Sequence, residues 1–193
     1  MNQLLDISIL LFGVLTYGSA VYQMRTGAYS PSFFSRGVWL LLGINSFAGV
    51  ALGGGSQSSK ILAATLLVGN AAVFVASIKK GSRQFGFTEQ ISLFLFVVSC
   101  ALWFVIDAPE INLMLSLAAH FIGGIPTIWR TIKKPSSEKA LHWYFFFVAS
   151  VLTIINSGSK GTLYWKAIIF PLYFVLFDGL IIFLVQRRRF LKR

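Results

Sequence analysis

Asp178 is the residue of this 193-residue sequence whose type and position most strongly indicate chemistry. It lies deep inside the apolar run Leu163–Val185, whereas the other acidic residues lie in or near the segments between runs. Inserting a charge at such a depth in a membrane costs about 2.5–3.5 kcal/mol, so the carboxylate needs a partner or a proton. We interpret Asp178 as a proton-carrying carboxyl group or a direct substrate ligand. The alternative is a neutral side chain hydrogen-bonded to another helix.

His120 and Asn70 are the next candidates, because each lies near the centre of an apolar run. His120 is the other ionisable group near that depth, and we expect it to titrate or to bind a ligand. The amide of Asn70 offers two donors and one acceptor, which suits a polar uncharged solute. Hydrogen bonding between helices explains Asn70 equally well. Asn45 and Asn156 are weaker candidates of the same kind.

Polar and small residues recur with the spacing i, i+3 and i+7 in two of the runs, which places them on one helix face in each. The members are Thr16, Ser19 and Gln23 in the first run, and His120, Gly123 and Thr127 in the second. Polar groups of membrane helices tend to face the bundle interior or a water-filled path. We therefore expect both stripes to line a substrate path, with close helix packing as the alternative.

Proline and glycine residues interrupt two of the runs and are candidate hinges. Pro126 follows Gly123 and Gly124 in one run, and Pro171 lies in another. Proline removes a backbone hydrogen bond and kinks a helix, and a gate needs such a hinge. A static kink is the alternative, since membrane helices tolerate proline well.

The elements that must position these residues are membrane-spanning helices. Hydrophobic residues make up 56% of the chain and charged residues only 12%, against roughly 25% charged residues in a soluble domain. A spanning helix needs about 20 apolar residues and pairs all of its own backbone groups. The sequence therefore predicts an all-α integral membrane protein with seven transmembrane helices. The predicted spans are Leu4–Met24, Gly37–Gly53, Ile61–Ile78, Gln90–Ile106, Ile111–Trp129, Leu141–Asn156 and Leu163–Val185.

The distribution of basic residues predicts the orientation of these spans. All of the 17 Lys and Arg residues except Lys60, Lys160 and Lys166 fall in alternate loops and in the C-terminal tail, and all but Lys166, at the outer edge of the last span, lie outside the predicted spans. By the positive-inside rule, the N-terminus is outside and the C-terminus is cytoplasmic, in a cell or inner membrane. Topology thus explains the net charge of +11 without nucleic-acid binding, because no basic stretch belongs to a soluble module.

Other classes of function find little support. The single cysteine, Cys100, excludes an intrachain disulfide, and we expect no metal and no cofactor. The sequence has no G-x-S-x-G, no H-E-x-x-H and no paired intramembrane carboxylates, so we expect no enzyme. We interpret His142 and Trp143, at the start of a run, as interfacial residues without chemistry.

The two halves of the chain resemble each other at an offset of 104 residues, where Pro31 aligns with Pro135 and Trp39 with Trp143. The apolar runs and the basic loops coincide at the same offset. Two parallel triple-helix repeats need one extra helix that returns the chain across the membrane, which gives a 3+1+3 plan. The sequence predicts a first repeat over 1–80, a linker helix within 81–108, and a second repeat with a basic tail over 109–193. In transporters with parallel repeats, the substrate site lies between the halves.

The segment GGIPTIWRTIKKPSSEKALHWYFFF resembles a repeat of the PQ-loop (MtN3/saliva, SWEET-like) transporters, with Pro126-Thr127 where the family has Pro-Gln. The first half keeps the glutamine, Gln23, without the proline. The resemblance implies alternating access for small polar solutes, with the proline hinge at Pro126. It also relates Asn70 to an asparagine of sugar-carrying members, and Asp178 to a proton-coupling aspartate of amino-acid exporters.

Together these observations predict a carrier of a small polar solute, a sugar or an amino acid, that works by alternating access. Protons are a candidate co-substrate, the lipid bilayer is the surrounding partner, and homo-oligomerisation is left open. The alternative is a non-transporting membrane receptor or assembly factor with the same helix plan. Such a protein would bind its partner through the basic loops and the C-terminal tail.

Overall fold

The computed structural model describes residues 2–81, 83, 85–106, 109–135, 140–161 and 164–191, and this part of the chain forms helices joined by short connections. The helices are α1 Asn2–Arg25, α2 Phe33–Leu52, α3 Gln57–Lys80, α4 Phe87–Ile106, α5 Pro109–Lys133, α6 Ala140–Ser159 and α7 Trp165–Leu191. Six of them are long and apolar enough to cross a membrane, and α4 contains a shorter apolar stretch, Glu89–Trp103. The described part of the chain thus confirms the prediction of a helical, multi-pass membrane protein as far as the length and composition of its helices are concerned.

The start of α2 differs from the predicted span, which begins only at Gly37. Ser32 caps this helix, since its Oγ accepts a hydrogen bond from the backbone N–H of Ser35 at 3.3 Å. A side-chain cap of this kind pairs an N–H that would otherwise lack a partner, so the helix can start four residues earlier. Arg36 therefore belongs to the first turn of α2. The prediction that it lies outside the helices is wrong.

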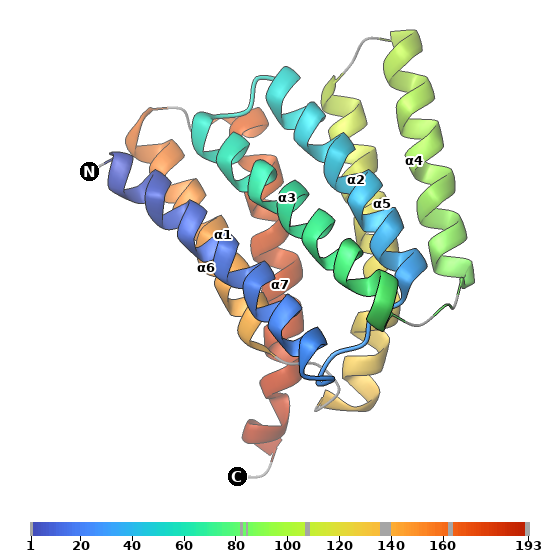
Figure 1. Ribbon diagram of the computed structural model, residues 1–193. Helices are drawn as coiled ribbons and strands as arrows, with labels where there is room; N and C mark the ends of the chain where they lie inside the picture. The colour runs from blue at the N-terminus through green and yellow to red at the C-terminus, as the bar shows by residue number, and fades with distance from the viewer. Residues whose placement is uncertain are drawn as a thin grey trace.

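The helices form two groups of three, α1–α3 and α5–α7, and in each group one helix packs between the other two. α3 lies between α1 and α2, and α7 lies between α5 and α6 (Figure 1). Contacts between these groups run mainly from α1 to α6 and from α2 to α5. α4 lies at the edge, against α5 and α2.

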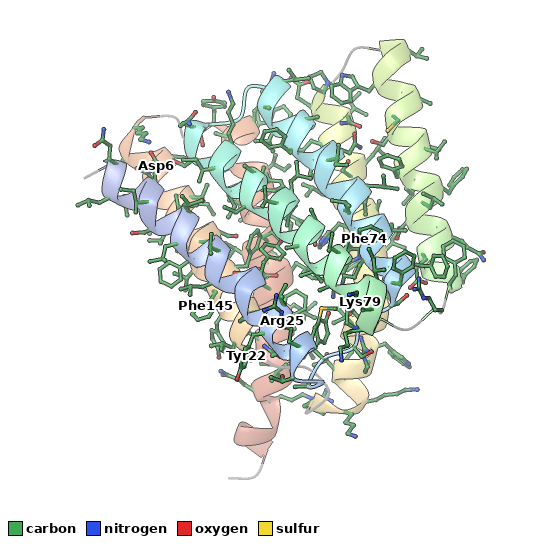
Figure 2. The ribbon with its side chains drawn as sticks, in the orientation of Figure 1. Asp6, Tyr22, Arg25, Phe74, Lys79 and Phe145 are labelled. Carbon is green, nitrogen blue, oxygen red and sulfur yellow. The ribbon has the colours of Figure 1, made fainter. Side chains whose placement is uncertain are left out.

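The outward faces of the bundle are apolar, as a lipid environment requires. Leu10, Val14 and Val68 are each about half to two-thirds exposed, and Phe183 on α7 is 62% exposed. We call the end of the bundle where α1 begins the amino end, and the opposite end, where α1 finishes, the carboxyl end. Figure 2 shows Asp6 at the amino end and Arg25 and Lys79 at the carboxyl end.

A buried cluster of polar side chains attaches α4 to α2 and α5. The amide nitrogen of Asn45 on α2 donates to Ser99 Oγ on α4 at 2.6 Å and to Ser116 Oγ on α5 at 2.5 Å. Ser99 Oγ in turn donates to Asn112 Oδ1, and Asn112 Nδ2 donates to the carbonyl of Asn45 at 3.4 Å. Asn45 is thus held among helices, which supports the structural alternative for this residue.

We expect Asn45→Ala to destabilise the protein by about 1–2 kcal/mol, because each interhelical hydrogen bond in a membrane contributes about 0.6 kcal/mol, up to about 1.7. Unfolding by SDS titration in mixed micelles measures the loss. Ile44→Ala is the matched control, since Ile44 is its neighbour on α2 and is 48% exposed. An equal loss in both variants would contradict a specific role for the amide.

Candidate functional site

A small cavity of about 40 Å³ lies inside the bundle, between the group α1–α3 and the group α5–α7. Its wall takes residues from six helices and from the connection between α1 and α2. The polar and aromatic residues that line it are Thr16, Tyr17, Tyr29, Arg36, Trp39, Asn70, His120, His142, Trp143, Phe146, Phe174 and Asp178. Leu66 and Val73 add an apolar patch from α3.

Four of the residues predicted to line a path meet at this cavity. Thr16, Asn70, His120 and Asp178 come from α1, α3, α5 and α7, and all four are at most 5% exposed. Residues far apart in the sequence thus reach one place because the polar face of each helix turns inward. Membrane proteins place polar groups in this way to remove them from lipid.

The other members of the two stripes do not line the cavity. The hydroxyl of Ser19 donates to the carbonyl of Thr16 at 2.7 Å, and the carbonyl of Thr127 accepts from the hydroxyl of Thr131 at 2.7 Å. Gln23 lies near the end of α1, where its carbonyl accepts from the backbone N–H of Tyr29 at 3.1 Å. A path through Ser19, Gln23 and Thr127 therefore stays a prediction.

The glycines of the predicted hinge sit against large aromatic side chains. A Cβ atom added at Gly124 would lie 2.5 Å from the ring of Phe177, and one at Gly123 would lie 3.0 Å from Nε1 of Trp39. These glycines let α5 approach α7 and α2 closely. Pro171 lies inside α7, and the side chain of Pro126 is outside the described residues. Hinge motion at these four residues stays a prediction.

Residues that were not predicted to line a path also border the cavity. His142 and Trp143 were expected to be interfacial, but they are 8% and 7% exposed and line the cavity. Arg36 brings a positive charge to the same cavity as Asp178. The alignment of Trp39 with Trp143 at the 104-residue offset was the sequence signal that could have indicated the two indoles.

Arg36 is held at the carboxyl-end side of the cavity by two aromatic rings. Its guanidinium carbon lies 4.6 Å from the centroid of the Trp39 ring and 5.5 Å from that of Tyr29. Its Nη2 also donates to the hydroxyl of Tyr29. Cation–π contacts of this kind hold a guanidinium in one orientation without neutralising it.

His120 forms part of the aromatic wall. Its ring lies 4.6 Å from that of Trp39, and its Nδ1 is 2.8 Å from the hydroxyl of Tyr173. The rings of Phe174 and Phe177 meet it edge-on. His120 thus packs against aromatic rings from α2 and α7.

The buried side-chain atoms that lack a hydrogen-bond partner, within the described part of the chain, all belong to residues of this cavity. They are Arg36 Nε, Trp39 Nε1, Asn70 Nδ2, His142 Nδ1, Trp143 Nε1 and Asp178 Oδ2. An unpaired buried polar atom costs about 1–3 kcal/mol. Such atoms gathered around one cavity are typical of a site that water or a ligand completes.

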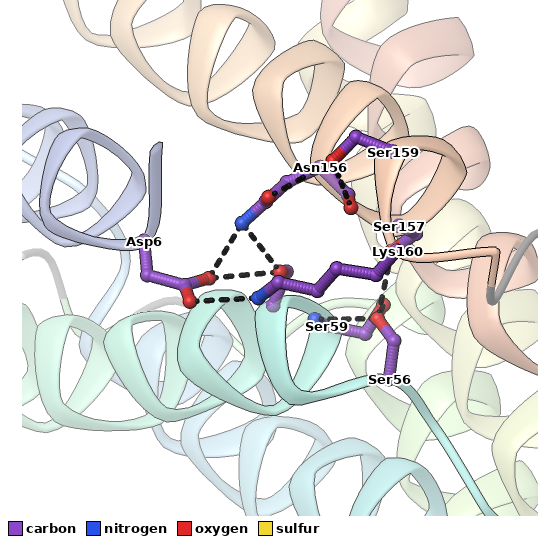
Figure 3. Close-up of polar contacts among 8 residues, drawn as sticks. Asp6, Ser56, Ser59, Asn156, Ser157, Ser159 and Lys160 are labelled. Atoms are coloured by element: carbon purple, nitrogen blue, oxygen red, sulfur yellow. Dashed lines mark hydrogen bonds and ion pairs between the residues drawn. The ribbon is translucent and has the colours of Figure 1, made fainter. Parts of the chain in front are cut away.

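The amino end of the bundle is closed by a network of polar side chains (Figure 3). Asp6 on α1 pairs with Lys160 beyond α6 at 2.9 Å and accepts hydrogen bonds from Asn156 and Ser58, each at 2.8 Å. Next to it, the hydroxyls of Ser56 on α3 and Ser157 on α6 are 2.8 Å apart. These contacts tie α1 and α3 to α6.

An apolar layer lies between this network and the cavity. Ile9, Leu62, Leu113 and Phe170 are at most 4% exposed and belong to one hydrophobic cluster, which reaches Phe174 on the cavity wall. Water has no polar partner in such a layer. The cavity is therefore separated from the amino end by two consecutive barriers.

Comparison with known proteins adds no relative. The chain matches no protein-family model, no curated protein and no solved structure. Within the described residues, no group of three or more His, Cys, Asp or Glu side chains could hold a metal ion.

Proposed function

We propose that this protein is a membrane carrier of the PQ-loop type, which moves a small polar solute, a sugar or an amino acid, by alternating access. The observation that carries this proposal is the set of unpartnered buried polar atoms around one central cavity. A protein that only anchored a partner at its surface would have no use for such an interior. Polar groups inside a membrane bundle are costly and mark substrate or ion pathways.

The packing of the helices supports two repeats that move against each other. In the proposed first repeat α3 lies between α1 and α2, and in the proposed second repeat α7 lies between α5 and α6. The surfaces that would slide are then α1 against α6 and α2 against α5. The cavity lies between these surfaces, as expected for a carrier with parallel repeats.

The small volume of the cavity supports a conformation close to the occluded state of this mechanism. One water molecule needs about 10–15 Å³ of such space, so a cavity of about 40 Å³ holds only a few. A solute can enter only when the repeats separate. At the amino end, this separation requires the Asp6–Lys160 pair and the Ser56–Ser157 contact to break.

The positive-inside rule gives the proposed orientation. The carboxyl end carries Arg25, Lys79 and Lys133 near the ends of α1, α3 and α5, so it would face the cytoplasm. The amino end, with its closed network, would face outside. The occluded cavity would then open to one side at a time, as Tyr29 and Arg36 move at the carboxyl end or the polar network breaks at the amino end.

We expect Asp178→Asn to lower solute uptake into proteoliposomes about tenfold or more. Asp178 is 1% exposed, and its Oδ2 has no hydrogen-bond partner in the protein. We therefore expect the solute or a proton to bind this oxygen. Uptake of a panel of labelled sugars and amino acids, compared with protein-free liposomes, measures the effect. Glu89→Gln is the matched control, because Glu89 interacts with Ser35 and the backbone N–H of Gly86, away from the cavity.

Unchanged uptake by Asp178→Asn would remove this residue from the mechanism. No uptake of any solute by the folded wild-type protein would contradict the carrier itself. Binding of a protein partner without solute movement would then favour the receptor or assembly factor.

A further inference from the structure

We infer that the solute is a small zwitterion, an α-amino acid whose carboxylate and ammonium groups are bound at separate places in the cavity. The inference deepens the proposed function and rests on it for the transport step. It follows from the kind and the position of the polar atoms that the cavity leaves without partners.

The first place is a group of donors at the carboxyl-end side. Arg36 Nε and Trp143 Nε1 are buried N–H groups without acceptors, and both residues line the cavity. Trp39 also lines the cavity, but its Nε1, which likewise lacks an acceptor, lies against Gly123 of α5. Arginine and indole N–H groups have no acceptor atoms of their own. A carboxylate offers about four lone-pair positions and is the small group that can satisfy several such donors at once.

The positive charge of Arg36 is not neutralised within the described part of the protein. No described carboxylate forms an ion pair with Arg36, whose contacts are the rings of Trp39 and Tyr29 and the hydroxyl of Tyr29. Arg36 is partly exposed, but its Nε is buried without an acceptor, and a charge held in such a place is costly unless a ligand supplies a counter-charge. A carboxylate does so, whereas an uncharged sugar does not.

The second place is the carboxylate of Asp178. Its Oδ2 is buried without a donor, and the residue is 1% exposed. Aromatic rings of Tyr17 and Phe174 line the same cavity. Ammonium groups are attracted to carboxylates and to the faces of aromatic rings, so this place suits the amino group of the solute.

The two places border the same small cavity. Trp39 follows Arg36 by three residues, about 4.5 Å along the axis of α2. Trp39 and Trp143 pack in one cluster with Phe177, the residue before Asp178. This cluster brings Trp39 and Trp143 next to the residue that precedes Asp178, and an α-amino acid carries both of its charged groups on one carbon atom.

The remaining wall limits the side chain of the solute. Leu66 and Val73 are apolar, and Asn70 offers one unpartnered N–H from Nδ2. Because the cavity is small in this conformation, about 40 Å³, we expect a solute with a short side chain, as in glycine, alanine or serine. The amide of Asn70 favours a side chain with a hydroxyl acceptor.

The test is ligand-induced thermal stabilisation of the purified full-length protein, followed by counterflow in proteoliposomes. The probes are glycine, L-alanine and L-serine, together with lactate, which lacks the ammonium group, ethanolamine, which lacks the carboxylate, and D-glucose. We expect at least one of the three amino acids to stabilise the protein, because a ligand that binds only the folded state raises its apparent stability. Lactate, ethanolamine and glucose should bind about 10- to 100-fold more weakly, since each leaves charged groups unpaired.

Substitutions test which residues bind the carboxylate and the ammonium group of the solute. Arg36→Gln and Asp178→Asn should each weaken binding of the amino acid about 10- to 100-fold. Trp143→Phe keeps the ring and removes one donor, and should weaken binding about fivefold to tenfold. Arg25→Gln is the control for loss of a positive charge, because Arg25 is exposed and does not line this cavity. If Arg36→Gln does not fold, Trp143→Phe still tests the carboxylate place.

The outcomes separate the inference from the proposed function. Counterflow of glucose without binding of any of the three amino acids would overturn the inference and leave the carrier intact. Amino-acid binding that matches lactate or ethanolamine in strength would also overturn it. Selective amino-acid binding without counterflow would support the zwitterion site and contradict the carrier.

Discussion

A disulfide across the amino end should abolish solute uptake, and reduction should restore it. Ser56 caps the start of α3 and Ser157 lies on α6, and their hydroxyl oxygens are 2.8 Å apart. Cysteine is close to serine in shape, and a disulfide needs its Cβ atoms about 3.5–4.5 Å apart. The double variant Ser56→Cys/Ser157→Cys, made in a Cys100→Ser background, would join the two proposed repeats covalently. Because alternating access requires this end to open, uptake into proteoliposomes should fall to the level of empty liposomes after oxidation.

The control pair places both cysteines on one helix. Ser56 and Ser59 are both on or next to the first turn of α3, with their hydroxyls 3.0 Å apart, so a bond between them cannot join the repeats. Ser56→Cys/Ser59→Cys should keep its uptake after the same oxidation. Full uptake by a completely cross-linked Ser56→Cys/Ser157→Cys protein would show that this end does not open during transport.

Gly69→Ala should cause the largest loss of stability among single-atom additions to the bundle. A Cβ at this position would lie 1.9 Å from Cδ2 and 2.0 Å from Cγ of the Tyr17 ring, so the ring or the helix must move. Overpacking of this kind costs about 1–3 kcal/mol, and a contact this short belongs at the upper end. Because Tyr17 also lines the cavity, its displacement should lower solute uptake as well. Thermal unfolding in detergent and uptake into proteoliposomes measure the two effects.

Gly18→Ala is the matched control for this prediction, since Gly18 lies on α1 beside Tyr17 and its added Cβ would meet nothing within 4 Å. Its melting temperature should stay close to that of the wild type. The double variant Gly69→Ala/Tyr17→Ala removes the ring that the new Cβ would strike. Its melting temperature should therefore be higher than the sum of the effects of Gly69→Ala and Tyr17→Ala, measured separately, would predict. Equal melting temperatures for Gly69→Ala and Gly18→Ala would contradict the tight packing of α1 on α3.

The helices of this protein were predictable because hydropathy is a local property. A run of about 20 apolar residues must form a helix in lipid, whatever its neighbours do. The same reasoning placed Asn70, His120 and Asp178 near mid-depth, and the structure brings all three to one cavity. The depth of a residue in a span follows from counting along the chain.

The start of α2 was less predictable from the sequence, and it decides that Arg36 belongs to the helix that lines the cavity. The unbroken apolar run begins only after Arg36, so hydropathy places this arginine in a loop. The hydrogen bond from the backbone of Ser35 to the side chain of Ser32 starts the helix before it. A cap contributes about 1 kcal/mol, which a hydropathy window does not register.

The sequence by itself thus determined that the chain crosses a membrane repeatedly as helices and that a carboxyl group lies deep among them. Only the tertiary structure decided which side chains face that carboxyl group, and it brought Arg36, Trp39, His142 and Trp143 to the same cavity. The reason is that the rotation of each helix about its axis follows from packing against several others, through contacts such as Gly124 on Phe177 and Gly69 on Tyr17. Such contacts join residues on different helices, and no pattern within a single run contains them.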